Sequence, residues 1–209
     1  MNAVLPRVEP DRATGLLDLR AWAAIAPLGA LVDARDGRPP RDRTIVRAAA
    51  GPVGLHVLFE CEDRDVWATH ARRDAPLWEE EAVEVFLAPG ARDPDRYVEI
   101  EISPAGVLFD ALVSNPDARR ATMRVDTSWT AAGLVGRTCR HGRASWSAEL
   151  SIPWRSLGEL GEAGGAWRAN FYRIERPHGE AAEYSAWSPT GADPPDFHKP
   201  ARFGHLVAS

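Results

Sequence analysis

Short segments in which apolar and polar residues alternate run along most of this chain. In the clearest of them, 97–103, three branched aliphatic residues alternate with Glu99, Glu101 and Ser103. A period of two places successive side chains on opposite faces of a β-strand, so each such segment predicts a strand with one apolar face. The same pattern predicts further strands at 44–48, 55–61, 82–87, 107–112, 134–139, 146–152, 167–174, 184–188 and 203–207.

Helical patterns are few and short. Residues 21–30 read either as a short helix or as an irregular edge, and 155–160 reads as a single helical turn. Turn residues such as Pro104-Ala105-Gly106 separate neighbouring strands. We therefore predict an all-β fold, an antiparallel β-sandwich of the jelly-roll or immunoglobulin-like two-sheet type, with one or two short helical turns.

The length and charge of the chain limit its organisation and partners. We expect a single domain over 1–209, with 1–15 as a candidate loose N-terminal segment. The net charge of -5 and scattered arginines argue against a nucleic-acid groove, and no apolar run is long enough to cross a bilayer. The first residues lack a signal-peptide pattern, which predicts a cytoplasmic protein if Met1 is the native start and a secreted or periplasmic one if the sequence is trimmed.

The segment 74–87 carries the most informative candidate chemistry. Trp78 stands at the start of a predicted strand, and Glu84 lies in that strand among apolar neighbours, on the opposite face from Val83 and Val85. A flat ring beside a fixed carboxylate suits a sugar, because the ring stacks on the C–H face and the carboxylate accepts hydroxyl hydrogen bonds. A core tryptophan followed by a solvated acidic turn remains the alternative.

The loop 63–77 contains the candidate metal ligands. Asp63, Asp65 and Asp74 offer the hard oxygen atoms that calcium prefers, although their spacing matches no EF-hand. A charged loop that is simply solvated would look the same. The six histidines are dispersed, which argues against zinc.

Several motifs, taken in order, resemble a known family. They are 78–87, Ile100-Glu101-Ile102-Ser103-Pro104-Ala105-Gly106, Ile152-Pro153-Trp154, 170–173, 186–189 and 197–206. Together they resemble the family 9 carbohydrate-binding modules and their stand-alone bacterial relatives in the DOMON-like group. The resemblance implies a β-sandwich without a catalytic centre, a sugar held between two tryptophans, and structural calcium as the one possible cofactor.

The resemblance carries over to particular positions. Trp78 matches the first clamping tryptophan, Glu84 matches the carboxylate six residues later, and Phe197 stands where the second tryptophan is expected. A family arginine falls near Glu101 and its amide neighbour near Ser103, so two hydrogen-bond donors are replaced.

We therefore expect non-catalytic binding of a small carbohydrate or of the end of a polysaccharide. Trp78 and Phe197 would stack on the sugar and Glu84 would accept hydrogen bonds from its hydroxyls. Arg173 would orient Glu84 or bond the sugar directly. The remaining candidate ligand-binding residues, which would line the edge or add a weaker carboxylate, are Asn170, Trp187 and Glu101.

Three other functions stay open. Phe197 in place of the second tryptophan, and Glu101 in place of the family arginine, favour a degenerate β-sandwich that binds a protein partner and no sugar. Glu84 and Glu101 on neighbouring strands could form the carboxylate pair of a glycoside hydrolase, whose carboxyl groups lie roughly 5–5.5 Å apart in retaining enzymes. A haem-binding relative would use Met123 and His198. Alternating glutamates on a solvated sheet face are common, so the outer face of a sheet explains Glu99 and Glu101 as well.

Overall fold

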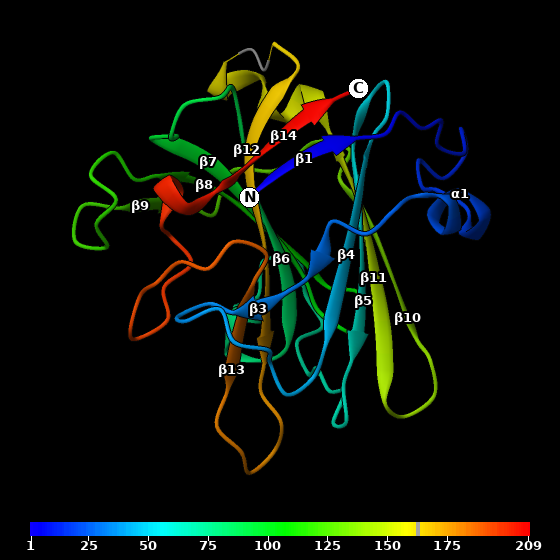
Figure 1. Cartoon of the computed structure of the whole chain (residues 1–209), viewed down its shortest axis with the longest axis vertical. Helices are drawn as coiled ribbons and strands as arrows, with labels where there is room; N and C mark the ends of the chain where they lie inside the picture. Colours follow the sequence, from blue (N-terminus) through cyan, green and yellow to red (C-terminus); the bar gives the residue numbers. More distant parts are fainter. Residues whose placement is uncertain (162–163) are drawn as a thin grey trace.

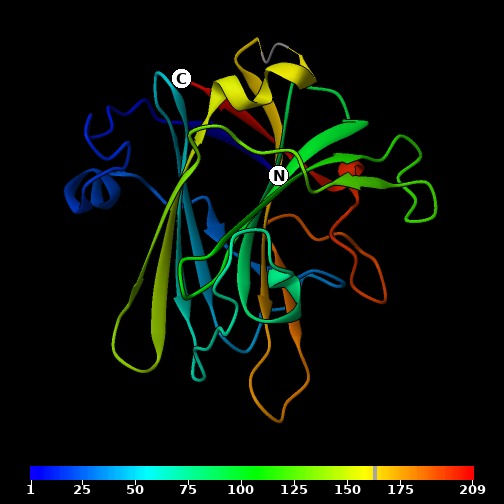
Figure 2. The same ribbon diagram turned by 180° about the vertical axis from the view of Figure 1, so that it is seen from behind.

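The computed structural model describes residues 1–161 and 164–209, and in those ranges the strands form two sheets packed face to face (Figure 1, Figure 2). The larger sheet runs in the order β1 (Asn2–Leu5), β14 (Gly204–Ala208), β12 (Ala166–Glu175), β6 (Ala82–Pro89), β7 (Arg96–Ile102), β8 (Leu108–Ser114) and β9 (Arg124–Asp126). At its side, β13 (Glu183–Ala186) pairs with β12 and with β3 (Val32–Asp33).

The smaller sheet and the helices complete the domain. The smaller sheet has the order β10 (Val135–Arg140), β11 (Ser145–Pro153), β5 (Gly54–Glu62), β4 (Thr44–Ala50) and β2 (Gly29–Ala30). The helical segments are α1 (Leu19–Ala24) and the 3-10 turns η1 (Leu77–Glu79), η2 (Trp154–Leu160) and η3 (Pro200–Arg202). The predicted all-β sandwich is confirmed. One pair departs from the antiparallel prediction, because β1 and β14 are parallel.

Part of the candidate loose N-terminal segment is built into the larger sheet. Residues 2–5 form β1, and Leu5 has no exposed surface. The short helix expected within 21–30 begins earlier, at Leu19, and the edge strand β2 follows it. The expected helical turn at 155–160 is η2.

The main core lies between the two sheets. Val83, Val85 and Leu87 of β6 point into it and are fully buried, as the alternation predicts. Trp187 also belongs to this core: it is 2% exposed and contacts Phe171 edge-on. The prediction that Trp187 lines a sugar site is therefore wrong, because the chain that directly follows β13 turns this ring into the core.

The outer face of the larger sheet is covered as well. The segment between β13 and η3 lays Phe197 on Tyr172, with ring centroids 4.1 Å apart. The Tyr172 hydroxyl also donates to the Phe197 carbonyl at 2.9 Å. His198 of this segment lies 3.9 Å from Glu99, and both Glu99 and Glu101 are buried, so the alternative of a solvated outer face is wrong for them.

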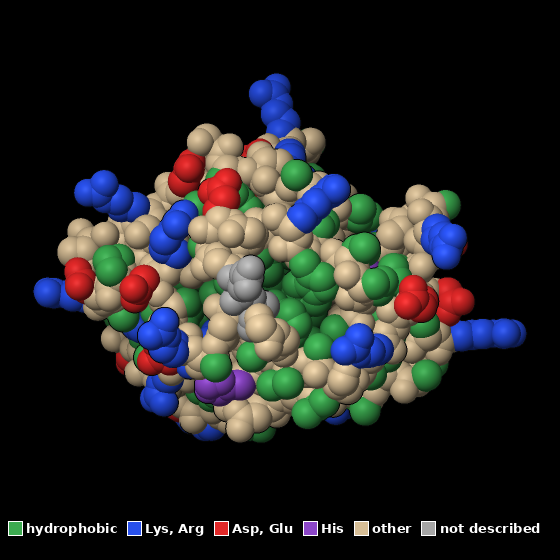
Figure 3. Space-filling model, turned by 90° about the horizontal axis from the view of Figure 1, so that it is seen from above, with side chains coloured by type: hydrophobic (Ala, Val, Ile, Leu, Met, Phe, Trp, Pro, Cys, Tyr) green, Lys and Arg blue, Asp and Glu red, His purple; other side chains and the backbone are tan. Residues whose placement is uncertain are grey.

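The end of the molecule that is uppermost in Figure 1 shows a mixed surface (Figure 3). Lys and Arg side chains are spread around this end, with apolar and acidic groups between them (Figure 3). Among the described residues, no helix is both long and apolar enough to span a membrane.

Candidate functional site

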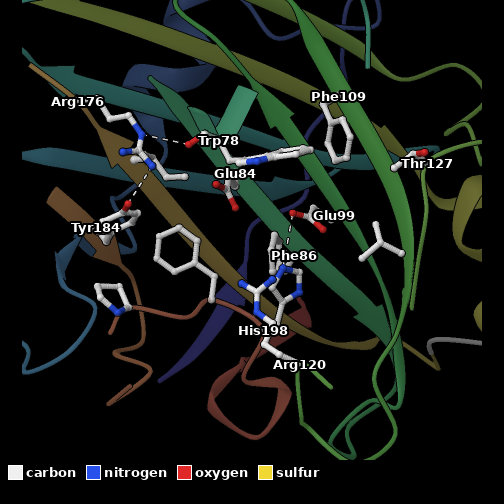
Figure 4. Close-up of a pocket in the computed structure, with 14 residues that line it drawn as sticks. Trp78, Glu84, Phe86, Glu99, Phe109, Arg120, Thr127, Arg176, Tyr184 and His198 are labelled. Carbon is white, nitrogen blue, oxygen red and sulfur yellow. Dashed lines mark hydrogen bonds and ion pairs between the residues drawn. The ribbon is translucent and has the colours of Figure 1, made fainter. Parts of the chain in front are cut away.

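A cavity of about 440 Å³ opens on the outer face of the larger sheet (Figure 4). Its lining comes from η1, from strands β6 to β9, from the end of β12 and β13, and from the loop before η3. The lining residues are Trp78, Glu84, Phe86, Glu99, Phe109, Arg120, Val125, Thr127, Ile174, Arg176, Tyr184, Pro195, Phe197 and His198. The volume lies within the usual range for a small-molecule site.

The two predicted stacking rings both reach this cavity. Trp78 sits in the single turn η1, just before β6, and is 40% exposed. The centroids of the Trp78 and Phe109 rings lie 5.2 Å apart in an edge-to-face contact, and the indole also lines the cavity. Phe197 is more buried, because one of its faces lies against Tyr172. Trp78 is therefore the freer of the two surfaces for a ligand.

Three glutamates make an acidic cluster beneath these rings. Glu84 on β6 faces Glu101 on β7, and Glu99 lies opposite Phe86. One carboxylate oxygen of each glutamate lies within 4.8 Å of those of the other two. Burial raises the pKa of Glu84 and of Glu101 well above the usual range, and raises the pKa of Glu99 to about 7.

Arg120 partly balances the cluster, since its charge lowers the pKa of Glu84 and of Glu99. Glu101 has no exposed surface, and neither of its carboxylate oxygens accepts a hydrogen bond from the described residues. His198 lies 3.9 Å from Glu99, but burial lowers its pKa to about 3, so its ring is neutral at ordinary pH. Arg120 reaches the cavity from a loop and pairs with Asp196 at 2.9 Å.

Two arginines at the cavity supply hydrogen-bond donors that the sequence analysis missed. Arg176 follows β12 and donates to the Trp78 carbonyl at 3.1 Å and to the Tyr184 hydroxyl at 2.9 Å (Figure 4). Tyr172 lies opposite Glu84 on the cavity face, and continued alternation along the chain places Arg176 on the same face. The sequence therefore contained a pattern that could have predicted Arg176 at the site. Arg120 lies between β8 and β9, where no periodic pattern predicts the path of the chain.

Arg173 does not contact Glu84, and this prediction is wrong. Arg173 lies opposite Val83 in the register, so its side chain points to the inner face of the sheet. Its guanidinium lies 3.1 Å from Asp63 and 2.7 Å from Glu175, and it donates to Thr44 of the smaller sheet.

Asn170 is on the predicted face but cannot line the site. Its side-chain amide donates to the Ser188 carbonyl at 2.8 Å and accepts from the Ser188 N–H at 2.9 Å. It is fully buried and does not reach the cavity. Its function is to hold the chain that follows β13.

The three candidate metal ligands do not come together. Asp65 pairs with His178 at 2.7 Å, and Asp74 is exposed beside Arg73. Asp63 instead gathers with Glu81 and Glu175, one oxygen of each lying within 4.8 Å of the others.

The cluster of Asp63, Glu81 and Glu175 fits calcium poorly. Arg173 already lies among these carboxylates, and Asp63 also accepts from the Trp146 indole at 2.9 Å. Burial raises the pKa of Glu81 to about 9 and that of Glu175 to about 8, so both carry protons at neutral pH. Asp63 and Arg173 then balance each other without a metal.

The geometry bears differently on the glycoside hydrolase and haem-binding alternatives. Glu84 and Glu101 do face each other across β6 and β7, as the hydrolase hypothesis requires. Glu101 is absent from the cavity lining, however, so a substrate would meet only one of them directly. His198 bonds the Tyr97 hydroxyl at 2.8 Å through Nδ1 and turns Nε2 to Glu99, which leaves no ring nitrogen aimed at a haem.

Comparison with known proteins identifies related chains. Residues 42–208 match the family described as carbohydrate-binding family 9. A protein from Arthroderma benhamiae, named only as an extracellular protein, is 27% identical over 142 residues, or 64% of each chain. This chain therefore spans slightly less than two thirds of that relative.

Solved structures share the fold over nearly the whole chain. One, from Bacteroides uniformis, is a protein whose carbohydrate binding is itself inferred; it has a TM-score of 0.76 at 21% identity, covering 100% of this chain and 99% of its own. A family 9 carbohydrate-binding module from Caldicellulosiruptor kristjanssonii, solved with cellotriose, has a TM-score of 0.66 at 12% identity. The match covers 100% of this chain and 94% of that module. A glucose complex of a family 9 module from that organism has a TM-score of 0.61 at 13% identity. The match covers 97% of this chain and 95% of that module.

Proposed function

Since the chain belongs to carbohydrate-binding family 9, we propose that its outer cavity binds a sugar ring, free or at the end of a chain, without cleaving it. The observation that carries this proposal is the partly exposed Trp78 ring, which shares one cavity with Phe197 and Glu84. The solved family 9 modules that hold glucose and cellotriose support the ligand class.

Each part of the cavity suits one part of a sugar. The faces of Trp78 and Phe197 would stack on the C–H groups of the ring, each contributing about 0.5–1.5 kcal/mol beyond the burial of area. Glu84 would accept hydrogen bonds from hydroxyls. Arg120 and Arg176 would donate to sugar oxygens, which compensates for the donors that the sequence lacks at Glu101 and Ser103.

The direct test is calorimetric titration with a panel of mono- and disaccharides, together with tryptophan fluorescence. We expect saturable binding in the micromolar to millimolar range, about -8 to -4 kcal/mol, by the wild-type protein. Trp78→Ala should lose at least about tenfold in affinity while its thermal unfolding stays close to that of the wild type, because Trp78 is largely outside the core.

Trp154→Ala is the matched control. Trp154 stacks on Trp167 at 4.5 Å and is not part of the cavity lining, so its removal should leave sugar affinity unchanged. Absence of binding across the panel at millimolar sugar would overturn the proposal. The protein-interaction sandwich would then be the function to pursue, by affinity capture of a partner.

A further inference from the structure

The floor of the cavity carries three acidic groups, and Arg120, whose positive charge lowers the pKa of Glu84 and Glu99, is itself paired with Asp196. In the cluster of Asp63, Glu81 and Glu175, Arg173 lies within 3.1 Å of Asp63 and Glu175. Beneath the cavity, by contrast, no lysine or arginine among the described residues pairs with any of the three glutamates, and His198 is neutral. Buried carboxylates require a proton or a cation, because an isolated buried charge is costly.

The acceptors stand close enough together to share one ammonium group. An ammonium has three N–H donors, and charge-assisted bonds of this kind are about 2.8 Å long. Three acceptors at that distance in tetrahedral directions stand roughly 4.6 Å from one another. One oxygen each from Glu84, Glu99 and Glu101 lies within 4.8 Å of the others, an upper limit that is compatible with this spacing, and apart from Glu99 no described residue offers a donor to the Glu101 oxygens.

The surroundings favour an organic cation over a metal ion. Calcium takes six to eight oxygen ligands. Apart from the carboxylates, only Thr127 and Tyr184 bring a side-chain oxygen to the described cavity lining, and the Tyr184 hydroxyl already accepts from Arg176. Aromatic rings, including Trp78 and Phe109, make up much of the remaining wall, and such rings attract organic cations through their π faces.

We propose that the preferred ligand of this cavity is an amino sugar, whose protonated amino group is held by Glu84 and Glu99 with Glu101 behind them. This inference rests on the proposed function, since the sugar ring would still lie against Trp78 and Phe197. Burial raises the pKa of all three glutamates, so the free protein holds protons there; the ammonium takes the place of one proton when the sugar binds, that proton leaves to solvent, and the other glutamates stay protonated.

The test compares three sugars of similar ring shape by calorimetric titration at about pH 6, where an amino group of this kind is protonated. Glucosamine carries the charge, N-acetylglucosamine carries the same nitrogen without it, and glucose has a hydroxyl there. We expect glucosamine to bind at least about tenfold more tightly than glucose, and N-acetylglucosamine to show no such gain.

Two variants assign the effect to the cluster. Glu101→Gln keeps the shape of the side chain and should reduce the preference for glucosamine over glucose to less than about threefold. Glu79→Gln removes an exposed carboxylate next to Trp78 that is outside the cluster, and should keep the full preference. Thermal melts of both variants confirm that the affinities are measured on folded protein.

The possible failures are distinguishable. Equal affinity for glucosamine and glucose would overturn the amino-sugar inference and leave the proposed function standing. Lack of binding by every sugar, glucosamine included, would overturn both. If calcium chloride strengthens glucose binding and EDTA abolishes it, the carboxylates hold a metal ion and the inference is overturned.

Discussion

The protonation of Glu101 is determined by its buried surroundings. It is fully buried, it faces Glu84 across the strand pair, and its two oxygens lack donors among the described residues. Burial is the largest cause of its raised pKa, followed by repulsion from Glu84 and Glu99. In the absence of a ligand, the ionised form of Glu101 therefore destabilises the folded state.

This burial makes the stability of the free protein depend on pH. The folded-state pKa of Glu101 lies above the value of 4.5 expected for the unfolded chain, so the folded state binds the extra proton. Its contribution to stability is complete below about pH 4.5 and is lost as the pH rises towards the folded-state pKa. Glu101→Gln should raise the free energy of unfolding by about 1–3 kcal/mol at pH 8 and by much less at pH 4, since the amide can donate to Glu99.

Urea unfolding of the wild type and Glu101→Gln at the two pH values measures this difference. Glu79→Gln, an exposed glutamate, should give the same change at both pH values. A gain for Glu101→Gln that does not grow with pH would contradict the prediction, because it would mean that folding does not raise the pKa of Glu101.

The face of Glu84 could be predicted from the sequence, but its burial could not. Alternation alone places Glu84 opposite Val83 and Val85, and the structure confirms this. The cover over that face comes from residues more than a hundred positions away, including Phe197 and His198. No local pattern reports such a contact, and this is also why Arg120 was missed.

At the scale of elements, strand length decided what could be predicted. The strands of six or more residues all contain enough alternation to be recognised. Those that were missed, β1, β2, β3 and β9, have four, two, two and three residues, which is too short for a period to stand out. Their positions depend on pairing with distant partners, such as β14 for β1.

The β5–β11 pair offers a sharp test of strand packing. Gly54 begins β5 beside the end of β11, and a Cβ atom there would stand 2.5 Å from the Ile152 carbonyl oxygen. Because the obstacle is backbone, it cannot move as a side-chain end would. Gly54→Ala should lower the free energy of unfolding by about 1–3 kcal/mol, the usual cost of overpacking.

Gly158→Ala is the control for this prediction. Gly158 lies in η2, where an added Cβ atom would meet no other atom within 4 Å, and its φ is not positive. Its replacement should be neutral or stabilising by up to about 1 kcal/mol. Chemical denaturation of both variants gives the comparison, and an equal effect at the two positions would contradict the proposed clash.

At the scale of the whole molecule, Arg173 ties the two sheets together. It belongs to β12 of the larger sheet, and its guanidinium donates to the Thr44 hydroxyl and the Glu62 carbonyl of the smaller sheet at 3.0 and 2.5 Å. It also balances the charge of Asp63. This side of the sheet faces away from the cavity, so the structure separates the residue that holds the sandwich together from those proposed to bind the sugar.

Arg173→Met should therefore affect stability and not ligand binding. Removing one partner of a buried ion pair leaves Asp63 uncompensated, which costs about 3–5 kcal/mol. Arg38→Met removes an ion pair whose arginine side chain is 79% exposed, and should cost less than about 1 kcal/mol. Adding Asp63→Asn to Arg173→Met should recover part of the loss, because the two positions interact directly. Sugar titration of the folded fraction decides between the two roles of Arg173: unchanged affinity fits the tie between the sheets, whereas a large loss of affinity at preserved stability would restore it to the binding site.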